Sequence, residues 1–319
     1  MVSTNTTISL GLVFLIQTGS GILGNSLLLC LFIFSLLTGN TLRPIDLILN
    51  QLVIANNLVL FSKGIPQTMA AFGLKSFLGD TGCKCVFYFH RVSRGVSLST
   101  TSLLSGFQVI KLCPTVSRWM ELRMRSPKCI SFCCFLCWIL HLVLNTFIMI
   151  NITGPTNSKN MSIQKNFVYC VSSHPDRLIV PLHAAIFFSI DAMCLGFVIL
   201  ASGSMVLLLH RHRKRVQYIH SRRLSPRTSH EVRATCTILV LVSSFVLFYS
   251  LSSILTLSFS LTINPSQWLV HTGVLVASCF PTFSPFVLIT SDTRVSQLCF
   301  ACWAKKAMFN NLVKCLLVF

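Results

Sequence analysis

Long apolar runs separated by short polar segments dominate this sequence of 319 residues. A run of about 20 apolar residues is long enough to cross the hydrocarbon core of a bilayer as a helix. The predicted membrane spans are residues 8–37, 45–72, 86–110, 129–150, 178–209, 234–261 and 268–290. The pattern therefore predicts an all-α membrane protein built as a bundle of seven transmembrane helices.

The third predicted span, residues 86–110, is the weakest because Lys84, His90, Arg91 and Arg94 lie at or inside it. Its assignment needs support from charge, since cytoplasmic segments near span ends are enriched in Lys and Arg. With seven spans and the amino terminus outside, cytoplasmic segments hold 18 of the 26 basic residues and outer segments hold five. Without the third span, the two most basic segments would lie on opposite sides of the membrane.

Three N-x-[ST] sequons provide a test of orientation that does not depend on charge. They are Asn5, Asn151 and Asn160, and such acceptors are glycosylated only on the lumenal or extracellular face. All three fall outside in this topology and are candidate glycosylation sites, although Asn151 lies close to the membrane. The first 42 residues carry no charge, so the first apolar run is expected to be a span and not a cleaved leader.

Composition removes several classes of function. Hydrophobic residues make up 53% of the chain and charged residues 10%, against about a quarter charged in soluble domains. The net charge of +19 lies in clusters between apolar runs, which indicates a lipid bilayer and not a nucleic acid as partner. Most of the 15 cysteines lie inside apolar runs and are expected to pack there. The common catalytic and phosphate-binding motifs are missing, so we expect no enzyme activity, cofactor or metal.

Short motifs along the chain bear on the kind of membrane protein. Gly24-Asn25 resembles the Gly-Asn pair of rhodopsin-like receptors, but Gly106-Phe107-Gln108 replaces their Asp-Arg-Tyr, and Ser284-Pro285 keeps only the proline of their last motif. The remaining motifs resemble the type-1 vomeronasal (pheromone) receptors. They are residues 62–73, 82–84, 90–95, 209–212, 216–220, 224–227, 233–235 and 280–288. The resemblance covers residues 20–303, within a single receptor domain of residues 1–303 and before a short cytoplasmic tail of residues 304–319.

This resemblance implies a chemosensory G-protein-coupled receptor of the plasma membrane. It implies a small-molecule, pheromone-like ligand bound within the helix bundle and a heterotrimeric G protein of the inhibitory type as partner. It also implies a disulfide between Cys83 and Cys170, for which Cys85 is a competing partner. A bitter-taste receptor is the closest alternative, and a small transporter or channel is the alternative from another class.

Buried charges in the third span are the best candidates for the mechanism. Arg91 and Arg94 lie about 12 and 17 Å along the helix from Cys83, and their spacing places them on one face. A charge at this depth is expected to face the bundle interior and to be paired. Asp191 is the only acidic residue well inside a span and is the natural partner of one arginine. These residues and His90 are candidate ligand-binding residues, and the alternatives are a structural ion pair and, for His90, packing.

A second group of basic residues follows the fifth predicted span. It consists of Arg211, Arg213, Lys214 and Arg215. Basic residues at a cytoplasmic membrane boundary interact with anionic lipid, so we expect an anchor at the inner leaflet. By analogy with the receptor family, the same residues are candidates for contact with the G protein.

Overall fold

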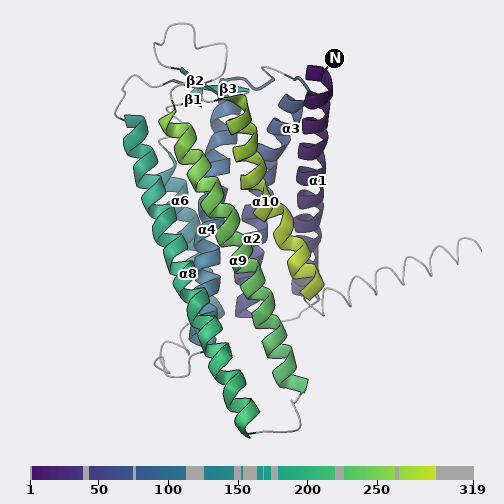
Figure 1. The fold of residues 1–319 in the computed structure, drawn as a ribbon, viewed down its shortest axis with the longest axis vertical. Helices are drawn as coiled ribbons and strands as arrows, with labels where there is room; N and C mark the ends of the chain where they lie inside the picture. Colours follow the sequence, from purple (N-terminus) through teal and green to yellow (C-terminus); the bar gives the residue numbers. More distant parts are fainter. Residues whose placement is uncertain are drawn as a thin grey trace, which may run out of the picture.

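A computed structural model describes residues 2–38, 43–74, 77–112, 126–146, 152–153, 164–167, 169–173, 179–219, 226–262 and 266–291. In this part of the chain, seven helical rods lie side by side in a bundle (Figure 1). They are α1 (Val2–Leu37), the continuous rod of α2 (Pro44–Val59), η1 (Leu60–Gly64) and α3 (Ile65–Ala71), α4 (Asp80–Leu112), α6 (Pro127–Leu144), α8 (Ile179–Ile219), α9 (Pro226–Leu261) and α10 (Gln267–Ser291). The predicted seven-helix bundle is confirmed.

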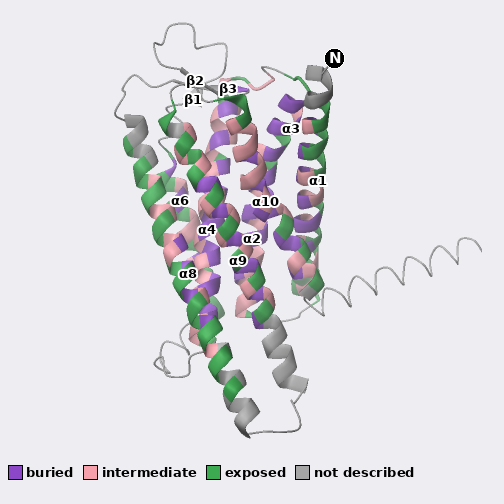
Figure 2. Ribbon diagram, in the orientation of Figure 1, coloured by how far each residue is buried: buried purple, intermediate pink, exposed green. Residues whose placement is uncertain are grey.

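Six rods are long and apolar enough to cross a membrane. These segments are Ile8–Leu37, Pro44–Ala71, Pro127–Leu144, Ala185–Leu208, Thr235–Phe259 and Gln267–Thr290. The seventh rod, α4, is too polar to meet the same criterion, but it packs against α2, α6, α8 and α9. Its exposed side chains, among those described, are Thr81, Phe89 and Lys111, and the other described side chains are buried or half-buried (Figure 2). The weakest span in the sequence is therefore a central helix, which has little contact with lipid.

Several of the hydroxyl side chains that make α4 polar form hydrogen bonds to the backbone of the same helix. Thr100, Thr101 and Ser105 each donate a hydrogen bond to the backbone carbonyl four residues earlier, at 2.6, 2.8 and 2.9 Å respectively. Buried hydroxyls need such partners because an unpaired polar group in an apolar interior is costly. The bonds lie within the helix itself, so they permit a polar sequence to form a buried membrane helix.

A π-helical turn, η1, interrupts the second rod just before Pro66. The N–H of Ile65 bonds to the carbonyl of Leu60, five residues earlier, so this turn is one residue wider than an α-turn. Pro66 has no N–H to donate to the preceding turn, and close to it the Thr68 hydroxyl donates to the carbonyl of Gly64, four residues earlier, at 2.7 Å. Wide turns of this kind occur frequently at functional sites, and Lys63 lies inside this one.

The Gly-Asn pair of α1 fits against the prolines of α10. Pro285 has no N–H to bond the carbonyl of Pro281, four residues earlier. The side-chain nitrogen of Asn25 donates to that carbonyl at 2.8 Å. A Cβ at Gly24 would lie 2.9 Å from the Pro285 ring, so glycine lets the two helices approach. The motif therefore joins α1 to α10 beside Pro285, where a backbone hydrogen bond of α10 is missing.

Strands that the sequence analysis did not predict lie at one end of the bundle. β1 (Ile152–Thr153), β2 (Gln164–Phe167) and β3 (Cys170–Ser173) form an antiparallel sheet in the order β1-β3-β2. The sheet lies at the same end of the bundle as the start of α1 (Figure 1). Each strand has only two to four residues, too short for an alternating pattern to be recognised.

At the opposite end, α8 and α9 extend beyond the other helices (Figure 1). The predicted spans leave residues 210–233 as a connection between two helices, but α8 continues to Ile219 and α9 begins at Pro226. Apolar length marks where a helix leaves the membrane and does not mark where the helix ends. The basic residues Arg211 and Lys214 accordingly lie, exposed, on the extension of α8.

Candidate functional site

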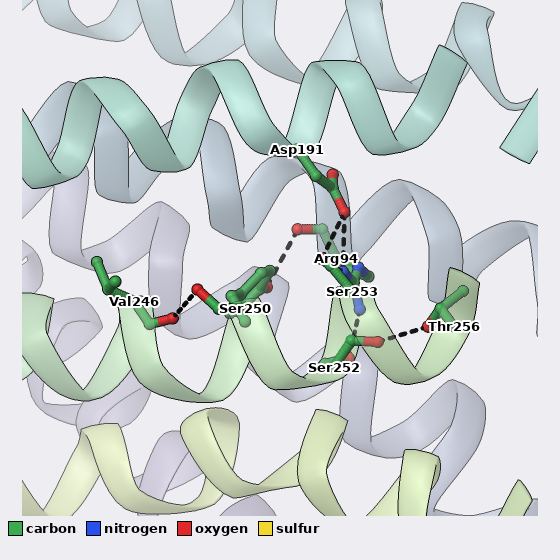
Figure 3. A network of polar contacts seen from close by, with 8 residues as sticks. Arg94, Asp191, Val246, Ser250, Ser252, Ser253 and Thr256 are labelled. Atoms are coloured by element: carbon green, nitrogen blue, oxygen red, sulfur yellow. Dashed lines mark hydrogen bonds and ion pairs between the residues drawn. The ribbon is translucent and has the colours of Figure 1, made fainter. Parts of the chain in front are cut away.

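An ion pair inside the bundle joins α4 to α8 and α9. Arg94 Nη2 lies 2.9 Å from Asp191 Oδ2, and the two side chains are only 11% and 18% exposed. Arg94 also donates to the hydroxyls of Ser252 and Ser253 at 2.6 and 2.7 Å. Ser253 in turn donates to Asp191 at 3.0 Å, and Figure 3 shows how these side chains converge. The structure thus answers which arginine pairs with Asp191.

Aromatic rings hold both arginines of α4. The Arg94 guanidinium carbon lies 5.1 Å from the centre of the Tyr249 ring, and the Tyr249 hydroxyl donates to the backbone carbonyl of Arg94 at 3.2 Å. The Arg91 guanidinium carbon lies 4.9 Å from the centre of the Phe187 ring. A cation over an aromatic face is stabilised by about 0.5–2 kcal/mol. Arg91 therefore faces α8, as Arg94 does, although it does not form the ion pair.

A small cleft between α4, α8 and α9 contains three of the four predicted residues. Its lining consists of Arg91, Arg94, Phe187, Phe188, Asp191, Ser253, Thr256 and Leu257. Apolar walls with a few converging polar groups are typical of small-molecule sites. Here the polar groups are two guanidinium groups, one carboxylate and two hydroxyls, which favour a ligand that accepts hydrogen bonds. The cavity of about 20 Å³ has room for about one water molecule, so a larger ligand requires the helices around it to move apart.

His90 lies on another face of α4, outside this lining. Its side chain is 6% exposed, and its Nδ1 has no hydrogen-bond partner among the described residues. It lies close enough to Lys63, Arg94 and Arg91 for their charges to act on it. The structure thus places three predicted residues in the cleft and the fourth, His90, outside it, within range of the charge of Lys63.

Sequence reasoning missed Ser252, Ser253 and Lys63. The two serines lie in an otherwise apolar span, where hydroxyls often bond to their own helix, so they gave no separate signal. Lys63 falls inside the predicted span of residues 45–72, but its position relative to α4 depends on how the η1 turn packs. Lys63 is half-buried, and a lysine inside a span is by itself a functional signal.

A disulfide fastens the sheet to the start of α4. Cys83 is bonded to Cys170, the first residue of β3, and their Cα atoms lie 5.9 Å apart. Cys85 is free and half-buried, so it does not take the place of Cys83. Tyr169 packs beside the bond against Phe77 and Phe87, and burial raises the pKa of its phenol. The sheet is therefore held over the end of α4 by covalent and apolar contacts.

Replacing Cys83 with serine should strongly reduce the folded chain at the cell surface. Loss of a native disulfide costs about 2–5 kcal/mol, and here it also frees the sheet. Surface labelling should show the same loss for Cys83→Ser, for Cys170→Ser and for the double variant, because all three break one bond. Cys85→Ser is the matched control and should retain wild-type labelling. Normal labelling of Cys83→Ser would contradict a structural role for the disulfide.

The remaining predicted sites lie partly outside the described residues. Asn151, Asn160 and the tail of residues 304–319 are outside them, and α1 is described at Asn5 only for the backbone. Arg213 and Arg215 lie on the α8 extension with Arg211 and Lys214, and their side chains are not described. These glycosylation and G-protein sites stay predictions.

Comparisons with known proteins agree with the motifs. The family model described as "Vomeronasal organ pheromone receptor family" matches residues 8–301. The chain is 59% identical to human "Vomeronasal type-1 receptor 1" over 303 residues, which cover 95% of this chain and 86% of the relative. It is 46% identical to human "Vomeronasal type-1 receptor 3" over 307 residues, covering 96% and 98%. "Olfactory receptor class A-like protein 1" of Danio rerio is 29% identical over 286 residues, covering 89% and 90%.

Proposed function

The chain belongs to the vomeronasal organ pheromone receptor family, and from that premise we propose that it binds a small pheromone-like molecule in the cleft and activates an inhibitory-type G protein. Family membership makes it a G-protein-coupled receptor of the cell membrane and not an enzyme. It also removes the bitter-taste alternative.

The observation that carries the proposal is the Arg94–Asp191 ion pair at the cleft. A buried ion pair within a membrane bundle is expensive and is usually kept for function. Arg94 connects α4 to both α8 and α9. A ligand that competes for Arg94 would therefore alter the contacts among three helices at once, which is a physical route from binding to a conformational change.

We also propose that the amino terminus and the sheet face the outside. The Cys83–Cys170 disulfide lies at that end of the bundle, and disulfides persist in an oxidising extracellular environment. The opposite end carries the exposed basic residues Arg211 and Lys214 on α8, in agreement with the enrichment of basic residues on the cytoplasmic side. In this orientation the extensions of α8 and α9 are available to a G protein.

A heterologous cell provides the test of the proposed function. The chain would be expressed with an inhibitory-type G protein, exposed to a panel of volatile and amphiphilic small molecules, and assayed for G-protein activation and membrane current in parallel. We expect activation without current, abolished by ADP-ribosylation of the inhibitory α-subunit. A ligand-dependent current with an inactive G protein would instead support the transporter or channel alternative.

A further inference from the structure

Positive charge around Arg94 is not balanced within the described part of the bundle. Lys63, in the η1 turn, lies close enough to Arg91 and Arg94 for their charges to repel it. Asp191 is the carboxylate of this region, and it is occupied by Arg94 and Ser253. Among the described residues, neither Lys63 nor Arg91 forms an ion pair. The region therefore contains three basic side chains and one carboxylate.

Such an arrangement is unstable in an apolar interior unless its charge changes. Lys63 and Arg91 are half-buried. An ion with little solvation and no partner is destabilising, and like charges repel more strongly where the dielectric constant is low. The arginines keep their protons, since guanidinium groups are effectively always charged. Either Lys63 loses its proton or an anion binds. His90 favours the second solution, because its Nδ1 is buried without a partner among the described residues.

We propose that Lys63 and His90, together with Arg91 and Arg94, form a subsite for a monovalent anionic group such as a carboxylate. Arg91 and Arg94 belong to both the cleft and this subsite, so an organic acid in the cleft can direct its charged group toward Lys63. Identifying the anion as the acid group of the ligand rests on the proposed receptor function. The same chemistry could be supplied by a free anion such as chloride.

Thermal unfolding of the purified full chain in lipid nanodiscs would test this. The probes are phenylacetate, its neutral isostere phenylacetamide, and chloride compared with the larger gluconate ion. We expect phenylacetate to raise the unfolding midpoint by roughly 3 °C or more at saturation, and phenylacetamide to have no effect. Without a probe, Lys63→Met should unfold at a higher temperature than wild type because the repulsion is gone, and it should lose the phenylacetate effect.

Two further variants control for charge and for general effects. Lys63→Arg keeps the cation and should keep the phenylacetate effect. Lys84→Met removes a lysine that is partly exposed in an i,i+4 ion pair with Asp80 and should respond as wild type does. A Lys63-dependent shift with chloride but not with phenylacetate would identify a free anion as the occupant. The subsite would be overturned if phenylacetate and phenylacetamide shifted the unfolding midpoint equally and chloride and gluconate did so too. It would also be overturned if the effect of an anion on the midpoint survived Lys63→Met.

Unfolding needs no G protein, so this test is separate from that of the proposed function. An anion effect in a chain that activates no G protein would leave the subsite in place and remove the receptor mechanism. G-protein activation in a chain whose unfolding midpoint shows no anion effect would leave the receptor mechanism in place and remove the subsite.

Discussion

Replacing Arg94 with methionine is expected to destabilise the protein by about 3–5 kcal/mol, because removal of one partner leaves a buried charge without compensation. Arg94 makes three side-chain hydrogen bonds, to Asp191, Ser252 and Ser253. Without it, the Asp191 carboxylate keeps only the bond from Ser253 in a cleft with apolar walls. Surface expression and the thermal unfolding midpoint should both fall sharply.

A double-variant cycle separates the ligand-binding role from the structural one. Asp191→Asn removes the carboxylate charge with little change of shape, so Arg94→Met with Asp191→Asn should recover much of the lost stability. If Arg94 binds ligand, this double variant should reach the surface and still fail to respond. If the double variant responded with wild-type potency, the role of Arg94 would be only structural, as the ion-pair partner of Asp191. Arg91→Met is the matched control for stability, since Arg91 does not form the ion pair and its loss should cost less.

The number and order of the helices could be predicted because burial in lipid requires long apolar runs. The same requirement explains why hydropathy predicts α4 only weakly as a membrane span. Apolarity measures contact with lipid, and α4 contacts other helices instead, so its sequence carries Ser97, Thr100 and Thr101 where a lipid-facing helix would carry leucine. Charge bias detected the helix that hydropathy did not, because it reports on the loops and is independent of packing.

At the site, sequence reasoning reached Asp191 and the two arginines because charges in a span are rare. It could not choose between Arg91 and Arg94, since both lie on one face of α4 and the choice depends on the packing of α8. It also could not bring Lys63 within range of the His90 and arginine side chains of α4. Their proximity depends on the η1 turn and on the contact between α2 and α4, two elements whose register cannot be obtained from either sequence segment alone.

Replacing Gly95 with alanine is expected to be among the most damaging single-methyl changes in the chain. A Cβ at Gly95 would overlap the imidazole ring of His141 on α6. That ring is buried, and its Nε2 lies 2.8 Å from the Ser99 hydroxyl, so it cannot turn aside without losing a bond. Two further hydrogen bonds hold α6 in place. Trp138 of α6 donates to the side chain of Gln51 on α2, and Tyr88 of α4 donates to the backbone carbonyl of Leu142 on α6. Overpacking of this kind costs about 1–3 kcal/mol and occasionally more.

The matched controls are Gly196→Ala and Gly203→Ala, because both glycines lie within α8 and a Cβ at either would meet nothing within 4 Å. There alanine should stabilise the helix by about 0.5–1 kcal/mol through its higher helix propensity. The same chemical change should therefore raise the unfolding midpoint in α8 and lower it in α4. Adding His141→Ala to Gly95→Ala should restore part of the loss by removing the overlapping ring. If Gly95→Ala matched the α8 variants, α4 and α6 would have to pack less closely than the Gly95–His141 contact requires.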